Sequence, residues 1–149
     1  MMSLFDPPDC EALRRRFAEL HPDSPRRWGR MDPAQMLAHC AASLDGVLAD
    51  RRLHRPLHWR LLGPLVRPLA LGPRPFPRGS TAPQEIVVTD SREFDAELRR
   101  LAHLLDRFVQ RGAEGMPREP HPFLGRLTGR QWGRLMYKHL DHHLRQFGV

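Results

Sequence analysis

The stretch TGRQWGRLMYKHLDHHLRQFGV, residues 128–149, decides the fold and contains a cluster of histidines. Thr128 and Gln131 form the capping-box pattern that begins a helix, and Gly148 is typical of a helix end. Leucines interrupt the histidines, so the cluster is not a purification tag. The stretch predicts a helix to about Phe147, with an apolar stripe at helical spacing made by Trp132, Met136, Leu140 and Phe147.

Helical phase separates the three histidines of this stretch. At about 100° per residue, His139 and His143 lie within about 20° of the line through Trp132, so both are expected to face the core. His142 lies roughly 80° from that line, at the margin of the stripe. The charged neighbours are predicted to point away from the stripe, namely Lys138, Asp141 and Arg145.

Two inward imidazoles one turn apart need partners, because a buried neutral histidine carries one donor and one acceptor. A metal ion is one explanation, since histidines at i and i+4 can bind an ion from one helix face. The other is a half-buried pair that is hydrogen-bonded to polar groups or water. The helical spacing alone favours the metal ion and the hydrogen-bonded pair about equally. Gln146, one turn beyond His143, could contact a ligand or a substrate.

A second helix is predicted from Asp32, where a capping residue precedes proline, to about Ala49 or Arg51. His39 flanks its apolar stripe, in line with Ser43 and Gly46, and these small residues allow another helix to approach closely. In an antiparallel arrangement, His39 and His139 would lie at one level. The three-histidine set would then be complete. The stripe itself consists of Met36, Leu37, Cys40, Leu44, Val47 and Leu48.

Two further helices are predicted from caps and apolar spacing. One begins at Asp6 and stops near His21, before a proline; the other begins at Asp90, with Glu93 completing a capping box, and ends at Gly112. Residues 52–89 between the second and third of the four helices are expected to be largely irregular. They are predicted to hold a short amphipathic helix in 56–72 interrupted by Pro64 and Pro68, an extended crossover over 73–83, and an extended run over 85–88.

These elements predict an all-α protein, a four-helix bundle forming a single domain over residues 1–149. The helices joined by short links are expected to lie antiparallel, and the long connection could cross the bundle. A homodimer is compatible with such a bundle, although no face is clearly left over for it.

Composition narrows the function classes. The net charge is +7, but nearly all the basic residues are scattered arginines without a recognition motif, which disfavours nucleic-acid binding. This arginine bias, with 15 prolines, is typical of a GC-rich genome, and a bacterial source is expected. No apolar run of about 18 residues and no signal-peptide pattern is found, so no membrane contact and a cytoplasmic location are expected. Cys10 and Cys40 give no disulfide framework, and Cys40 is predicted to lie in the core.

The other histidines rank lower as ligands. His103 is predicted to be solvated, and His21 and His121 precede prolines in turns. His54 and His58 belong to the long connection and could line the mouth of a pocket, although a surface position is favoured.

Two motifs, WGRMDPAQMLAHCAASL (28–44) and HPFLGRLTGRQWGRLMYKHLDHHLRQFGV (121–149), resemble an uncharacterised domain-of-unknown-function family within the DinB-like (YfiT-like) metalloenzyme superfamily. The resemblance implies a DinB-like four-helix bundle in which His39, His139 and His143 hold a divalent metal. The segment HLDHHLRQ (139–146) resembles the superfamily's His-x-x-His-His-Arg-Gly-Gln run, with LRQ in place of RGQ. His142 matches a histidine of that run that is usually not a main ligand, so His142 and Gln146 are expected to act from outside the ligand set.

The resemblance also implies functions, because relatives include thiol-dependent enzymes that use bacillithiol or mycothiol. A divalent transition metal (zinc, nickel or iron) held by three histidines would keep open positions, as catalytic sites do. The expected function is a metal-dependent thiol transferase or hydrolase with a small-molecule thiol or electrophilic substrate. The alternative is a non-catalytic bundle with a structural or vestigial metal site. Asp45 and Asp141 both point away from their stripes, so no general base is evident, which weakens the hydrolase version.

Overall fold

The computed structural model describes residues 1–50, 57–79 and 86–149, and the regular elements in these ranges are helical. An isolated antiparallel bridge between His121 and Gly125 is the exception. No helix in the described part of the chain is long and apolar enough to cross a membrane. The all-α prediction is confirmed, with the elements α1 (Pro7–Ala18), α2 (Pro33–Leu48), α3 (Leu57–Leu71), α4 (Phe94–Arg111), the 3-10 helix η2 (Ala113–Gly115) and α5 (Gly129–Phe147).

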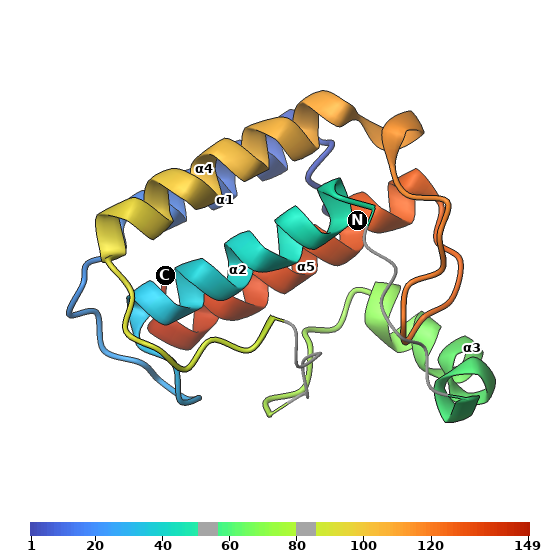
Figure 1. The fold of residues 1–149 in the computed structure, drawn as a ribbon, viewed down its shortest axis with the longest axis horizontal. Helices are drawn as coiled ribbons and strands as arrows, with labels where there is room; N and C mark the ends of the chain where they lie inside the picture. Colours follow the sequence, from blue (N-terminus) through green and yellow to red (C-terminus); the bar gives the residue numbers. More distant parts are fainter. Residues whose placement is uncertain (51–56, 80–85) are drawn as a thin grey trace.

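Four long helices, α1, α2, α4 and α5, lie along one another, with α3 to one side (Figure 1). The helices joined by short links run in opposite directions, α1 against α2 and α4 against α5, as predicted. The most extensive contact is between α2 and α4, which run in the same direction. This parallel pairing requires the long connection, because the chain must return from the end of α2 to the level of its start.

A single hydrophobic cluster fills the space between these helices. Each helix contributes the face that its apolar spacing predicts, and Leu13, Leu44, Phe108 and Leu140 are fully buried. The predicted stripe of the last helix is confirmed in full, with 4–7% exposure for its other members, Trp132, Met136 and Phe147. Burial of these side chains supplies the main favourable contribution to folding.

Capping side chains fix the starts of the two helices that carry the candidate site. Thr128 Oγ1 accepts from the backbone N–H of Gln131 at 3.2 Å, and the Gln131 side chain accepts from the backbone N–H of Thr128 at 2.9 Å. Asp32 and Gln35 form the same reciprocal pair at the start of α2. Gly148 ends α5 in the left-handed conformation, with φ +82°. The predicted boundaries of both helices are confirmed.

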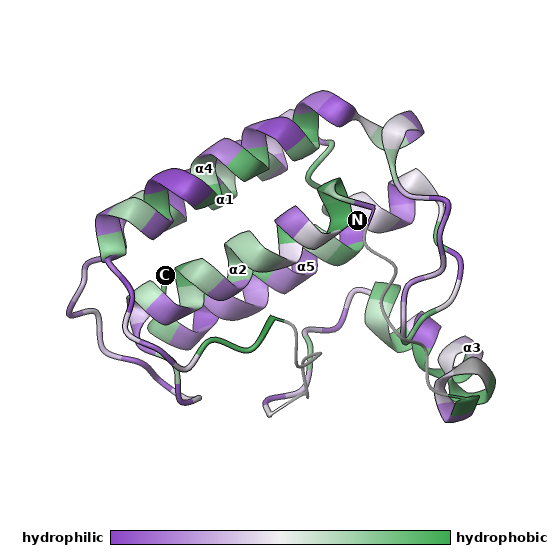
Figure 2. Ribbon diagram, viewed as in Figure 1, coloured by the Kyte–Doolittle hydropathy of each residue, from purple (hydrophilic) through white to green (hydrophobic). Residues whose placement is uncertain are grey.

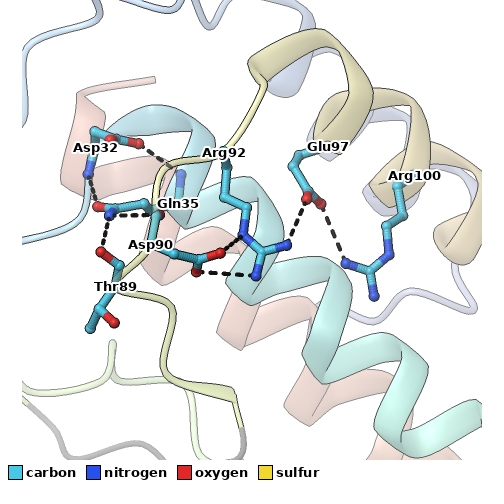
Figure 3. Close-up of polar contacts among 7 residues, drawn as sticks. All are labelled: Asp32, Gln35, Thr89, Asp90, Arg92, Glu97 and Arg100. Carbon is cyan, nitrogen blue, oxygen red and sulfur yellow. Dashed lines mark hydrogen bonds and ion pairs between the residues drawn. The ribbon is translucent and has the colours of Figure 1, made fainter.

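The start of α4 was predicted wrongly. The helix begins at Phe94, and Glu93, not Asp90, caps it by accepting from the N–H groups of Asp95 and Ala96. The Asp90 carboxylate instead pairs with Arg92 at 3.1 Å, and its carbonyl accepts from the Gln35 side chain, also at 3.1 Å (Figure 3). These contacts hold residues 89–92 extended against the start of α2.

Two other predictions need correction. α1 ends at Ala18, three residues before His21. The helix of the long connection is continuous, with Pro64 and Pro68 inside it rather than interrupting it. Each proline removes one intrahelical hydrogen bond, but contacts with the rest of the protein support α3. The extended run predicted for 85–88 lies partly outside the described residues, as does the crossover over 73–83; residues 87–89 form neither helix nor strand.

Candidate metal centre

Three histidines from two helices converge at one point between α2 and α5. The ring centroids are 5.0 Å apart for His39 and His139, 4.5 Å for His39 and His143, and 4.7 Å for His139 and His143. One ring nitrogen from each lies within 4.8 Å of the other two. His39 is 3% exposed and His143 7%, whereas His139 is partly exposed. The structure therefore brings together the three residues that the sequence singled out.

The His39 ring is oriented by the long connection. Its Nδ1 lies 2.7 Å from the carbonyl oxygen of Ile86, which can only accept a hydrogen bond. The proton therefore sits on Nδ1, and Nε2 keeps its lone pair. Gln35, one turn earlier on α2, donates to the carbonyls of Thr89 and Asp90 at 3.2 and 3.1 Å (Figure 3). Residues 86–90 thus run along α2 and hold the first histidine in one tautomer.

The His143 ring is oriented from its own helix. Its Nδ1 lies 2.7 Å from Oε1 of Gln146, three residues further along α5. As with His39, the acceptor places the proton on Nδ1 and leaves the lone pair on Nε2. Hydrogen bonds of this kind are the usual means by which proteins orient histidines that bind a metal. Gln146, which was expected to act from outside the ligand set, contacts His143 directly.

The His139 ring contacts a hydroxyl instead of a carbonyl. Ser43 Oγ donates to the backbone carbonyl of His39 at 2.9 Å and lies 3.2 Å from Nε2 of His139. Because the single hydroxyl proton is directed to the carbonyl, the Ser43 oxygen accepts from Nε2–H. In this arrangement His139 keeps its lone pair on Nδ1. The small side chain at position 43 also lets α5 approach α2 closely, as predicted. The same prediction for Gly46 is wrong, because a Cβ there would meet no atom of the described residues within 4 Å.

All three imidazoles are held in the neutral form. Burial, together with the nearby His39, lowers the pKa of His143 to about 3, although the hydrogen bond to Gln146 acts in the opposite direction. Burial lowers the pKa of His139 well below its usual range, and the neighbouring histidines, His143 first, add to that effect. Burial also lowers the pKa of His39. Neutral imidazoles are the form that binds metal ions.

His142 lies at the margin of the cluster, as predicted. It is half-buried, with its ring centroid 5.3 Å from that of His143, 6.1 Å from Trp28 and 5.9 Å from Phe76. The guanidinium of Arg78 lies over the Trp28 ring, 4.4 Å from its centroid. A pocket of about 250 Å³ adjoins this region and is lined by Arg27, Trp28, Arg78, Arg145, Gly148 and Val149.

The charged residues of α5 point away from the three histidines, but two of them do not simply face water. The Asp141 carboxylate is buried against α1, where it pairs with Arg16 at 2.7 Å, and it also pairs with Arg145 at 2.8 Å. Lys138 Nζ donates to the carbonyls of Leu69, Ala70 and Gly72 at the end of α3. Sequence reasoning identified the direction of these side chains and missed their partners.

The remaining histidines lie apart from the candidate site or at its edge. His103 and His58 are exposed, as predicted, and His21 is exposed as well. His121 is partly buried, and its Nδ1 accepts from the backbone N–H groups of Phe123 and Leu124. His54 lies outside the described residues. Cys40 is fully buried among apolar side chains, and burial raises the pKa of its thiol, so its predicted place in the core is confirmed.

Sequence reasoning missed two groups that shape the site. The Ile86 carbonyl is a backbone group, and nothing in the run 85–88 signals that it would face His39. Trp28 lies in the quoted 28–44 motif, but the motif does not indicate contact with His142 more than a hundred residues later. In both cases the tertiary arrangement alone brings the partners together.

The chain belongs to a protein family that is described only as "protein of unknown function (DUF1569)", whose profile matches residues 4–148. The predicted relation to an uncharacterised family is thereby confirmed, without an assigned activity. Comparison with curated proteins gave no match, and comparison with solved structures gave none either.

Proposed function

We propose that this protein binds one divalent transition metal ion, zinc, nickel or iron, through His39, His139 and His143. The observation that carries the proposal is the convergence of three neutral imidazoles whose ligand atoms lie within 4.8 Å of one another. Acceptors hold two of the rings with a lone pair on Nε2. A metal ion bound between the rings would use the lone pair that each of them keeps. The same arrangement supports a DinB-like bundle formed by the four long helices.

We further propose that the site is catalytic, acting as a thiol transferase or hydrolase. Three protein ligands leave positions for water or substrate, as in catalytic zinc sites. When bound, the metal would lower the pKa of a water or thiol. Residues of the chain would orient the ligands, as the Ile86 carbonyl does for His39 and Gln146 does for His143. The Asp141 carboxylate is engaged by two arginines, which favours thiol transfer over hydrolysis.

The neighbouring pocket supports a small, anionic substrate. Three of its lining residues are arginines, and its volume of about 250 Å³ suits a molecule smaller than a typical drug. The Trp28 ring connects this pocket to His142, which touches His143. A carboxylate-bearing thiol or electrophile could therefore place its charge at Arg27 and Arg78.

Metal analysis of tag-free protein tests the site. We expect about one equivalent per chain, the stoichiometry of a three-histidine site. His139→Ala should remove most of it, whereas the exposed His103→Ala should keep it. If the metal content of His139→Ala is the same as that of the unmodified protein, the assigned site is wrong. Circular dichroism of both variants distinguishes loss of metal from loss of fold.

The alternative function is a structural metal site without catalysis, favoured by the near-complete burial of His39 and His143. A conjugation screen of the metal-loaded protein with bacillithiol, mycothiol and other small thiols against electrophiles separates the two. Turnover by the unmodified protein that is lost in His139→Ala supports a catalytic function. Full metal loading without turnover of thiols or esters supports the structural role.

A further inference from the structure

α3 exposes an unusual amount of apolar surface. Its exposed leucines lie within one arc of about 140° of the helix circumference and are Leu57 at 69% exposure, Leu61 at 73%, Leu62 at 46%, Leu65 at 77% and Leu69 at 47%. Figure 2 shows this hydrophobic helix set apart from the four long helices. We call these five residues the leucine face. Contiguous exposed apolar patches mark interaction sites.

The leucine face is held outward because the opposite side of α3 is occupied. Trp59 packs on Phe123 with ring centroids 4.9 Å apart, and Ala70 is buried. Arg67 donates to the Gln131 side chain at 2.7 Å, where α5 begins. Lys138 binds the carbonyls at the end of α3. Turning the leucines inward would break all of these contacts.

The excess of basic residues comes from the part of the sequence that contains α3. Residues 51–84 contain none of the 17 acidic residues and seven of the 24 basic ones, which leaves 17 of each in the remainder of the chain. The segment therefore accounts for the whole net charge of +7. Its arginines are Arg51, Arg52, Arg55, Arg60, Arg67, Arg74 and Arg78.

We propose that the leucine face docks onto an anionic lipid bilayer surface, with α3 lying in the plane of the interface. Helices that bind membranes in this way combine a leucine-rich face with arginine or lysine and little acid. Each basic residue near an anionic surface adds about 1 kcal/mol of attraction. This peripheral contact differs from membrane spanning, and it departs from the expectation from composition that no membrane is involved.

The positive charge around the leucine face disfavours a second copy of the chain or another protein as its partner. A symmetric contact between two copies through this face would bring two arginine-rich, acid-free segments together, and like charges oppose such an interface. A protein partner would have to supply an acidic groove for a convex helix. A lipid surface needs no groove, because it deforms around the leucines.

Vesicle flotation tests the proposal. We expect binding to vesicles of phosphatidylcholine with phosphatidylglycerol, weaker binding to phosphatidylcholine alone, and a decrease with added salt. The double substitution Leu61→Ser/Leu65→Ser should weaken binding about tenfold or more, since it removes two inserted side chains. The matched control Val109→Ser changes an exposed apolar residue on α4 and should bind as the unmodified protein does.

Three outcomes would overturn the lipid assignment. The first is no binding to anionic vesicles at low salt, and the second is equal binding by the double variant. The third is a dimer in light scattering that the double variant dissociates while vesicles bind neither form. Metal content should stay the same in the double variant, so this test stands apart from that of the histidine site.

Discussion

The side-chain oxygen of Gln146 lies 2.7 Å from Nδ1 of His143, one turn away on α5. Gln146 is itself fixed in place, because its backbone carbonyl accepts from the N–H of Arg27 at 2.6 Å. A Cβ on Gly29, which has φ +91°, would come within 2.9 Å of the Gln146 side-chain nitrogen. The loop before α2 therefore leaves room for a glutamine whose oxygen sets the tautomer of His143.

Replacing this glutamine should weaken metal binding without removing a ligand. Gln146→Leu removes the acceptor at Nδ1 of His143, and loss of such a partner typically lowers metal affinity about 10–100-fold. Gln146→Glu keeps an oxygen acceptor and should retain or increase affinity. A competition titration with a chromophoric chelator measures both variants. Equal affinities of Gln146→Leu and Gln146→Glu would contradict the role given to this hydrogen bond.

We expect the long connection to influence metal affinity as well, because its Ile86 carbonyl orients His39. Gln35→Ala breaks the contacts with the carbonyls of Thr89 and Asp90 and loosens the segment whose Ile86 carbonyl orients His39. We expect weaker metal binding, along with a loss of about 1 kcal/mol of stability from the broken capping box.

Gln131→Ala is the matched control for that variant. Gln131 holds the same capping-box position on α5, and its side chain contacts Arg67 rather than Thr89 and Asp90. Urea denaturation should give similar losses of stability for the two variants, and chelator competition should show weaker metal binding only for Gln35→Ala. A similar loss of affinity in both would mean that the effect comes from helix stability alone.

The convergence of the three histidines was largely predictable because they lie on helices whose period of about 3.6 residues can be recognised in the sequence. The phase of His139 and His143 relative to Trp132 gives their direction, and the two histidines needed no information from outside α5. His39 required an assumption about how α2 and α5 lie side by side, and the small residues Ser43 and Gly46 made it reasonable. The structure places His39 where that assumption requires.

The boundaries set by long-range contacts were not predictable. Asp90 and Glu93 are both reasonable caps, and the choice between them depends on Gln35 and Arg92. Likewise, the continuous α3 with two internal prolines depends on Lys138 and Arg67, which are distant in sequence from their acceptors. Local patterns give the intrinsic preference of a segment, and tertiary contacts decide between options of similar energy.

The neutral histidines should make the metal-free protein sensitive to acid. The pKa of His143 is about 3 in the folded protein and about 6.5 when unfolded, and those of His39 and His139 are lowered too. Below pH of about 6.5 the unfolded chain binds protons that the folded chain does not, so the free energy of unfolding falls as pH falls. The slope should approach about 1.4 kcal/mol per pH unit for each such histidine, down to the folded pKa.

Urea denaturation in the presence of a chelator, at several pH values below 7, measures this slope. His143→Gln should flatten it, because one proton-binding difference is removed, whereas the exposed His103→Ala should leave it unchanged. An unaltered slope in His143→Gln would show that this imidazole is not held neutral by burial.

Disrupting the ion pair between Arg16 and Asp141 tests whether this carboxylate has a structural or a catalytic role. Asp141 is the acidic residue nearest in sequence to the ligands, but it faces α1 and pairs with Arg16 at 2.7 Å, with side-chain exposures of 13% and 24% respectively. Asp141→Asn should lower the free energy of unfolding by about 1–3 kcal/mol, less than for a fully buried pair.

The matched control is Asp106→Asn at the more exposed pair with Arg14, which should lower the free energy of unfolding by no more than about 1 kcal/mol. Metal content should be unchanged in both variants. Loss of metal from folded Asp141→Asn would instead place this carboxylate in the site and make hydrolysis the favoured reaction.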